Sequence, residues 1–158
     1  MPISRRSTLG LVLTAPAVAM IAFVALPRGS QAQPVAPVNA GDGVAILGTD
    51  PVAYFTDGAA VPGDPAISAD WRGARWLFAT EDHRAMFVAD PAAFAPQFGG
   101  YCSWAVAQGY TASIDPEAWK IVGGKLYLNY SKKVQGKWER DIPGNIVRAN
   151  TNWPGLQE

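Results

Sequence analysis

The sequence predicts an α+β fold, a small domain in which short β-hairpins pack against several short helices. Two features carry this expectation. Apolar runs interrupted by glycine turns are typical of hairpins, and Ser, Thr or Asp directly before a helical segment is typical of a helix N-cap. The chain has 158 residues, of which 49% are apolar and 16% charged. This composition is typical of a globular protein, and the length fits one domain with a leader before it.

Residues 1–32 have the features of an export signal peptide that is cleaved before residue 33. Arg5 and Arg6 supply a positive start, residues 7–27 carry no charge, and Ser30 and Ala32 place small side chains at the two positions that a signal peptidase needs. The paired arginines resemble a twin-arginine signal. An ordinary secretory signal and an uncleaved anchor are the alternatives, since 21 uncharged residues are just long enough to span a bilayer. We expect a periplasmic or secreted protein, free of the membrane after cleavage.

Composition excludes several kinds of site. With 1 Cys and 1 His, the chain cannot form an intramolecular disulfide, a zinc finger, a CxxC redox pair or an HExxH metalloprotease helix. The 13 basic and 13 acidic residues form no basic stripe, so nucleic acid is not an expected partner. Removal of residues 1–32 lowers the basic count from 13 to 10 and leaves 13 acidic residues, a net charge of −3.

The first part of the exported chain predicts a linker and then extended segments. Residues 33–48 are rich in Pro and Gly and predict a linker that leads into a domain over 49–158. The short apolar run 50–55 predicts a strand or an extended segment, which ends at the turn signal 56–58. Residues 71–78 alternate around a glycine and predict a hairpin.

Helix caps organise the next segment. Thr80 predicts an N-cap, because two acidic residues follow it in the first turn, where the helix dipole favours negative charge. The helix that follows carries His83, Met86 and Phe87 on one side. The pair Asp90-Pro91 predicts a second, short helix, with a capping Asp and a Pro at the first helical position.

The last third of the chain predicts a loop, a hairpin and two helices. Gly99 and Gly100 precede a run of small residues and predict a loop that leads into a helix, with backbone amides exposed to a ligand or a thiolate. Residues 115–117 predict a cap or turn, and 119–130 predict a hairpin around a Gly-Gly turn. We also expect Ser131 to cap a helix that ends near Asp141, and a last helix over 144–150 with Ile146 and Val147 facing inward.

Five short motifs occur in an order and at a spacing that resemble a YHS domain, a module related to the heavy-metal-binding TRASH domains. They are Asp50-Pro51-Val52, Phe78-x-x-x-x-His83-x-x-x-Phe87, Asp90-Pro91-x-x-Phe94, Gly99-Gly100-Tyr101-Cys102 and Gly124-Lys125-Leu126-Tyr127-Leu128-Asn129-Tyr130. The last two resemble the exported bacterial, selenoprotein-like subgroup of that family. The resemblance covers about residues 47–154, and it implies a small α+β fold and a role in metal binding.

The chain departs from the metal-binding members of this family at the ligands. Those members have Cys after Asp-Pro-Val and two Cys in a Phe-Cys-x-x-x-Cys helix, and the corresponding residues here are Ala53, Ala79 and His83. Two of the three ligands implied by the resemblance are therefore missing. His83 remains, and Cys102 provides a thiol elsewhere in the chain.

Cys102 is the residue from which we predict a function. A glycine pair and a helix start beside a thiol are expected to lower its pKa and favour the thiolate. One thiolate and one imidazole suit copper or zinc, and a thioether from Met86 favours copper. We therefore predict an exported, non-enzymatic protein that binds or handles a metal ion, most plausibly copper, through Cys102, His83 and Met86. Tyr101 and the two glycines before it shape this site, and a periplasmic protein is a further candidate partner.

Several alternatives stay open at this point. Cys102 as a redox-active thiol is one, since an unpaired thiol in an oxidising compartment is exposed to oxidation. A structural or small-molecule-binding domain with Cys102 in the core and His83 on a helix surface is another. A Cys–His hydrolase and an aromatic ligand groove formed by some of the 6 Trp are further options. The separation between the Cys102 sulfur and the His83 ring distinguishes these interpretations.

Overall fold

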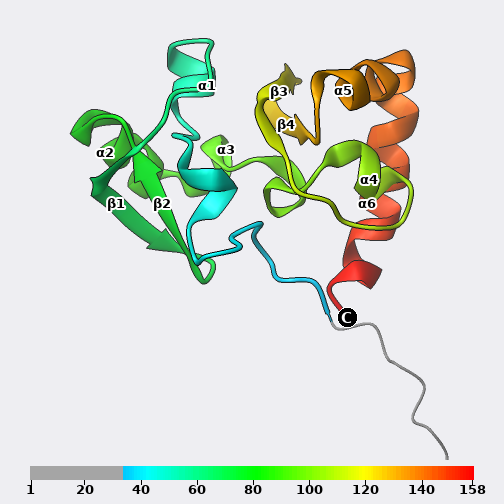
Figure 1. Ribbon diagram of the computed structural model, residues 1–158, viewed down its shortest axis with the longest axis horizontal. Helices are drawn as coiled ribbons and strands as arrows, with labels where there is room; N and C mark the ends of the chain where they lie inside the picture. Colours follow the sequence, from blue (N-terminus) through cyan, green and yellow to red (C-terminus); the bar gives the residue numbers. More distant parts are fainter. Residues whose placement is uncertain (1–33) are drawn as a thin grey trace, which may run out of the picture. The chain divides into compact units, whose positions relative to one another are not determined.

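Two antiparallel β-hairpins and a set of short helices make up residues 34–158, the part of the chain described by the computed structural model (Figure 1). The strands are β1 (Asp64–Trp71), β2 (Ala74–Phe78), β3 (Asp115–Val122) and β4 (Lys125–Asn129). The α-helices are α1 (Ala53–Thr56), α2 (Glu81–Ala89), α3 (Pro91–Phe94), α4 (Ser103–Ala107), α5 (Lys132–Trp138) and α6 (Ile142–Leu156). Short 3₁₀ turns are η1 (Ala45–Gly48), η2 (Gln97–Gly100) and η3 (Glu139–Asp141). The predicted α+β class is confirmed.

The first hairpin pairs β1 with β2 around a two-residue turn. Trp71 and Ala74 are cross-strand partners, and Arg72 and Gly73 between them both have positive φ, 50° and 76°. Two positive φ angles in succession are typical of the type I′ turn, whose twist suits a β-hairpin. The prediction of a hairpin is confirmed. Strand β1 starts earlier than expected, at Asp64, and its register shifts between Asp64 and Ser68.

The second hairpin pairs β3 with β4 around Gly123 and Gly124, as predicted. Asp115, expected in a cap or turn, is instead the first residue of β3 and pairs with Asn129. The Asp115 carboxylate accepts a hydrogen bond from Glu117 N at 3.0 Å, just where the register shifts. The turn-like sequence therefore marks an irregularity within the strand rather than a break before it.

The predicted helix caps are confirmed by their hydrogen bonds. Thr80 Oγ1 accepts from His83 N at 3.1 Å at the start of α2, and Asp90 Oδ1 accepts from Ala93 N at 3.2 Å at the start of α3. Ser131 Oγ accepts from the third amide of α5 at 3.2 Å. Each side chain satisfies one of the amides that a helix N-terminus leaves free.

The segment 50–55 forms a turn that leads into helix α1 at Ala53, although its sequence predicts a strand or an extended segment. Asp50 Oδ1 accepts hydrogen bonds from Val52 N at 2.8 Å and Ala53 N at 3.3 Å, which folds the chain into the turn of α1. The apolar run in the sequence suits a turn and a short strand equally well. The hydrogen bonds of the Asp50 side chain are what favour the turn.

The last helix is longer than predicted, and one side chain that was expected to face the core faces solvent. Asp141 caps α6 by accepting from Gly144 N at 3.0 Å, so the helix begins before residue 144, and it continues through Pro154. Ile146 packs against the core as expected. Val147, also expected inside, is 65% exposed, because consecutive helix residues lie about 100° apart and Ile146 takes the inward direction.

The segment expected as a linker, residues 33–48, contributes to the core over its described part. Val38, Ala45 and Ile46 are buried, and Asn39 N donates to Gly99 O at 2.8 Å. The Pro- and Gly-rich composition therefore reflects tight turns against the domain rather than a flexible connection. The predicted signal peptide, with Arg5, Arg6 and the cleavage position, lies outside the described residues.

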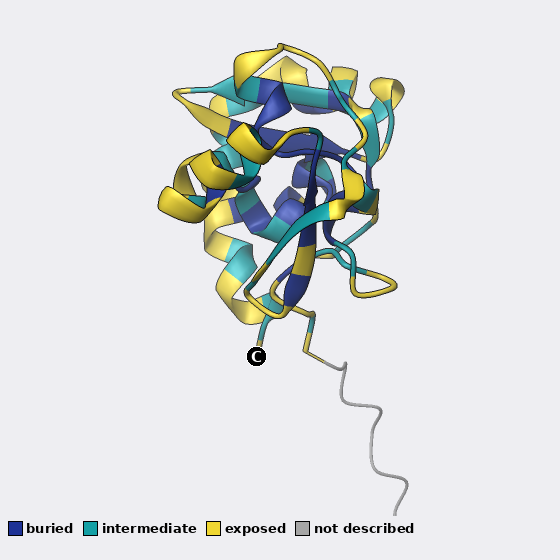
Figure 2. Ribbon diagram, turned by 90° about the vertical axis from the view of Figure 1, so that its left-hand side faces the viewer, coloured by how far each residue is buried: buried dark blue, intermediate teal, exposed yellow. Residues whose placement is uncertain are grey.

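Two groups of buried apolar side chains form the core, which Figure 2 shows as the buried parts of the ribbon. The larger group includes Trp76, Phe78 and Phe87 from the first hairpin and α2, together with Leu126 and Leu128 from β4. The smaller group, around Trp138, includes Phe98, Tyr127 and Ala149 and lies where α4 packs against α6. Among residues 34–158, no helix combines the length and the apolar character needed to cross a bilayer.

Candidate functional site

His83 belongs to a network of hydrogen bonds centred on the carboxylate of Asp50. Asp50 is fully buried, and its Oδ2 lies 2.6 Å from His83 Nδ1 and 2.8 Å from Ala79 N. Its Oδ1 accepts from Val52 N and Ala53 N. Both oxygens of this buried carboxylate are therefore paired, as a buried charge requires.

The three positions that the resemblance assigns to metal ligands converge at this carboxylate. The backbone N–H groups of Ala53 and Ala79 donate hydrogen bonds to Asp50, and His83 Nδ1 lies within hydrogen-bond distance of the same carboxylate. The second ring nitrogen of His83 lies 3.2 Å from Thr56 Oγ1, and the His83 side chain is only 12% exposed. Both ring nitrogens of His83 thus lie within hydrogen-bond distance of a polar side chain.

Cys102 is buried at the position just before α4. Its side chain is 1% exposed, and Sγ lies 3.8 Å from Asn129 Oδ1, which also accepts from Trp104 N at 3.2 Å. Burial raises the pKa of the Cys102 thiol, while the backbone amides of Ala105, Tyr130 and Trp104 act in the opposite direction. The prediction of a lowered pKa is therefore wrong, because loss of water around the sulfur outweighs the favourable amides.

A small hollow of about 190 Å³ reaches the thiol from outside. Its walls are mostly apolar and aromatic; they are formed by Cys102, Trp104, Ala105, Tyr110, Ala112, Tyr130 and Val134. Beside the thiol, Asn129 Nδ2 and Ser103 Oγ are buried without a hydrogen-bond partner among the described residues. Unpaired buried polar atoms are uncommon in folded proteins, so this corner has unused hydrogen-bonding capacity.

The structure does not join Cys102 and His83 in one site. Helix α2, which carries His83, packs against β1, β2 and α3, whereas α4 behind Cys102 packs against α5, α6 and β4. The two side chains share no hydrogen-bond partner in the described chain. Met86 is 40% exposed on α2, and no group of three or more His, Cys, Asp or Glu side chains lies together within residues 34–158.

The glycine pair before Cys102 serves close packing. Gly99 and Gly100 have φ of 61° and 79°, and a Cβ on Gly100 would overlap the Ile46 side chain. Tyr101 donates a hydrogen bond to Val38 O at 3.4 Å. These residues, expected at a ligand site, hold segment 37–46 against the loop that precedes Cys102.

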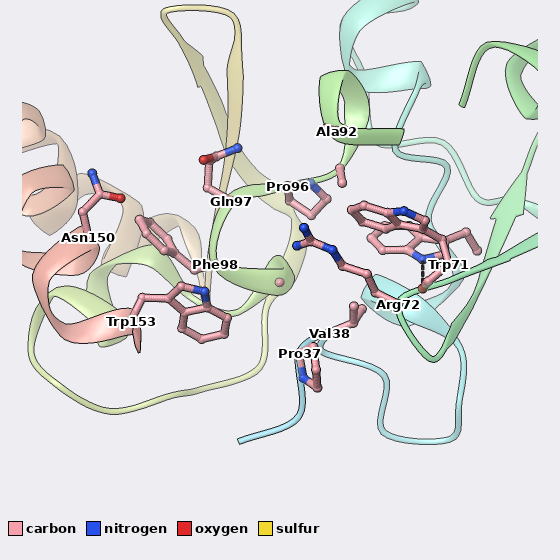
Figure 3. A pocket seen from close by; sticks show the side chains of 13 residues that line it. Pro37, Val38, Trp71, Arg72, Ala92, Pro96, Gln97, Phe98, Asn150 and Trp153 are labelled. Atoms are coloured by element: carbon pink, nitrogen blue, oxygen red, sulfur yellow. Dashed lines mark hydrogen bonds between the residues drawn. The ribbon is translucent and has the colours of Figure 1, made fainter. Parts of the chain in front are cut away.

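A larger hollow lies between the first hairpin turn, η2 and α6, at three of the tryptophans that the sequence offered for an aromatic ligand groove. We call it the Arg72 cavity. It has a volume of about 270 Å³ and is lined by Pro37, Val38, Trp71, Arg72, Trp76, Ala92, Ala95, Pro96, Gln97, Phe98, Gly99, Asn150 and Trp153. Figure 3 shows the Arg72 side chain extending into the space between Trp71 on one side and Phe98 and Trp153 on the other. The sequence did not single out Arg72, which stands at the hairpin turn directly before Gly73.

Arg72 is the one charged side chain among the residues that line the Arg72 cavity. No Asp or Glu lines it, and Arg72 forms no ion pair with any residue of the described chain. The guanidinium lies over the Trp71 ring, with its carbon 4.5 Å from the ring centroid. Gln97 and Asn150 add side-chain amides, and more of the exposed surface of the cavity is polar than apolar.

Comparison with known proteins adds no family or relative, since no family model, curated protein or solved structure matches the chain.

Proposed function

We propose that the protein is a non-catalytic small-molecule-binding domain and that the Arg72 cavity is its binding site. The observation that carries this proposal is the lining of the cavity. Trp71 and Trp153 are half-buried and contribute aromatic surface, Trp76 and Phe98 are buried, and Arg72 and two side-chain amides contribute polar groups. Small-molecule sites are typically concave and mostly apolar, with a few polar groups that fix orientation.

The same lining argues against catalysis. None of the side chains around the cavity is a His, Cys, Ser, Lys, Tyr, Asp or Glu, so no general acid, general base or nucleophile faces it. Cys102 and His83, the reactive side chains expected from the sequence, lie elsewhere and apart from each other. A binding function is therefore better supported than an enzymatic one.

Two related probes test this proposal: naphthalene-2-carboxylate and naphthalene-2-carboxamide, which share a planar apolar body. We expect at least one to bind, by calorimetry and by a change in tryptophan fluorescence. Trp153→Ala should weaken binding about tenfold or more, because it removes one wall of the cavity. Trp119→Ala is the matched control, since Trp119 is also half-buried but lines neither the Arg72 cavity nor the hollow at Cys102. Failure of both probes to bind, or equal losses in the two variants, would overturn the proposal.

The hollow at Cys102 supports a second candidate function, thiol redox chemistry. The Cys102 thiolate would attack a peroxide oxygen, forming an S–O bond as the O–O bond breaks and releasing water as hydroxide takes up a proton. The buried Asn129 Nδ2 and Ser103 Oγ are hydrogen-bond donors without partners that suit the new sulfenate oxygen. Hydrogen peroxide followed by dimedone should add one label to the protein and none to Cys102→Ser. Absence of the label at alkaline pH, where the thiolate is populated, would exclude this chemistry.

Metal handling and export stay predictions. For copper or zinc, a competition with a chromophoric chelator compares the protein with Cys102→Ser, and equal affinities would remove Cys102 as a ligand. For export, the mass of the protein recovered from the periplasm identifies any cleavage before residue 33. An unprocessed protein retained in the membrane would instead support the anchor alternative.

A further inference from the structure

We infer that the Arg72 cavity selects a small aromatic carboxylate, with Arg72 as the residue that recognises the negative charge. This inference rests on the proposed binding function and adds the chemical class of the ligand. It depends on three features of the described chain, namely the unusual position of Arg72, the absence of a counter-charge and the arrangement of the aromatic walls.

The position of Arg72 is unfavourable for an arginine. Its φ of 50° lies in the left-handed region, which non-glycine residues rarely adopt, and the first turn position of a type I′ hairpin favours Asn, Asp or Gly. The next residue, Gly73, suits its own φ of 76°. Turn geometry alone therefore does not explain an arginine here. Its position does direct a long cationic side chain into the cavity (Figure 3).

Arg72 and Arg140 form no side-chain hydrogen bond or ion pair in the described chain, whereas the other arginines of the domain do. Arg75 donates to Ser68 Oγ and Pro65 O, and Arg148 pairs with Asp141. Arg72 has only the face of Trp71 beneath it, and that contact leaves the edge N–H groups of the guanidinium available. A planar guanidinium matches the two oxygens of a carboxylate, to which it donates a pair of parallel hydrogen bonds.

The aromatic side chains define the rest of the ligand. Trp71 lies on one side of the guanidinium, and Trp153 and Phe98 lie on the other (Figure 3). The guanidinium covers the face of Trp71, so a planar apolar body would pack against Trp153 on the other side of the cavity, while its carboxylate meets the edge of Arg72. Because no acidic side chain lines the cavity, nothing there would repel the anion.

The test compares the two naphthalene probes in four proteins by calorimetry. The carboxylate should bind the unaltered protein about 10- to 100-fold more tightly than the neutral carboxamide, the range expected of hydrogen bonds to a charged group. Arg72→Asn should remove this preference and leave carboxamide binding unchanged. Asn-Gly is the preferred pair for this turn, so the variant should fold. Arg72→Lys should keep part of the preference, and Arg75→Gln, on the neighbouring strand, should keep all of it.

The outcomes separate the two proposals. Equal binding of both probes to the unaltered protein, or a preference that survives in Arg72→Asn, would overturn the carboxylate inference and leave the proposed function standing. If neither probe binds, both the proposed function and this inference fail. A carboxylate preference lost in Arg72→Asn and kept in Arg75→Gln supports the assignment of Arg72.

Discussion

Asp50 Oδ2 lies 2.6 Å from His83 Nδ1 and joins the start of α1 to α2 across 33 residues of sequence. With Ala79 N on the same oxygen, this pair fixes the end of β2, the first turn of α2 and the turn of α1 relative to one another. The resemblance to metal-binding domains implied thiolate ligands in this region. A buried carboxylate and an imidazole lie there instead.

Substitution of Asp50 should be among the most destabilising changes in the domain. Asp50→Asn replaces one acceptor oxygen by a donor that faces either backbone amides or the His83 ring, and we expect a loss of about 3 kcal/mol or more in unfolding free energy. Urea denaturation followed by tryptophan fluorescence measures it. The exposed pair Arg84–Glu81 on the same helix supplies the control, and Arg84→Gln should cost less than about 1 kcal/mol. Similar losses in both variants would contradict a central role for Asp50.

Gly100 should not tolerate a side chain. A Cβ there would overlap Ile46, and φ of 79° is unfavourable for alanine, so Gly100→Ala should lower the unfolding free energy by about 2 kcal/mol or more. Gly136, exposed in α5 with open space around it, is the matched position. Gly136→Ala should raise the unfolding free energy by about 0.5–1 kcal/mol in the same denaturation experiment. A neutral effect at Gly100 would mean that the loop before Cys102 shifts easily.

The domain should become less stable at alkaline pH. Burial raises the pKa of the Cys102 thiol above its ordinary value of 9.0 and that of the Tyr54 hydroxyl above 10.0. The unfolded chain then releases these protons at lower pH than the folded one. Stability that is complete below the unfolded pKa values is therefore lost as the pH rises through about 9 and beyond. Denaturation between about pH 7 and 11 measures the slope, and Cys102→Ser should reduce it; an unchanged slope would exclude Cys102 as a source.

The cap of α5 offers a smaller and more local effect. Ser131 Oγ accepts from Val134 N at 3.2 Å, and Ser131→Ala should cost about 1 kcal/mol of unfolding free energy. Ser131→Asp preserves an acceptor at the N-terminus and should restore most of this loss. If the Asp variant is as unstable as the Ala variant, capping is not the reason for Ser131.

The elements that could be predicted are those with local causes. Thr80 and Ser131 cap helices through amides three residues away, and the two-glycine turn of β3–β4 fits its own backbone angles, so sequence patterns are sufficient. The turn of α1 depends on Asp50, whose partners include the distant His83. No local pattern distinguishes that turn from a strand.

The candidate site was harder to predict because its parts are far apart in sequence. The Arg72 cavity combines the first hairpin turn with Phe98 from η2 and Trp153 from α6, and only the packing of these elements creates it. The error on Cys102 has a similar origin. A helix start lowers a thiol pKa where water reaches the sulfur, and the sequence does not reveal that the side chain is buried.

The ends of the domain meet in one further contact, in which Val35 N donates to Leu156 O at 2.9 Å. Translation adds residues one at a time. Segment 35–46 therefore cannot complete its contacts until almost the whole domain, including Leu156, has been synthesised. During that interval Ile46 and Val38, later buried, are exposed to water or to a chaperone. The domain is therefore expected to complete its fold only after Leu156 has left the ribosome.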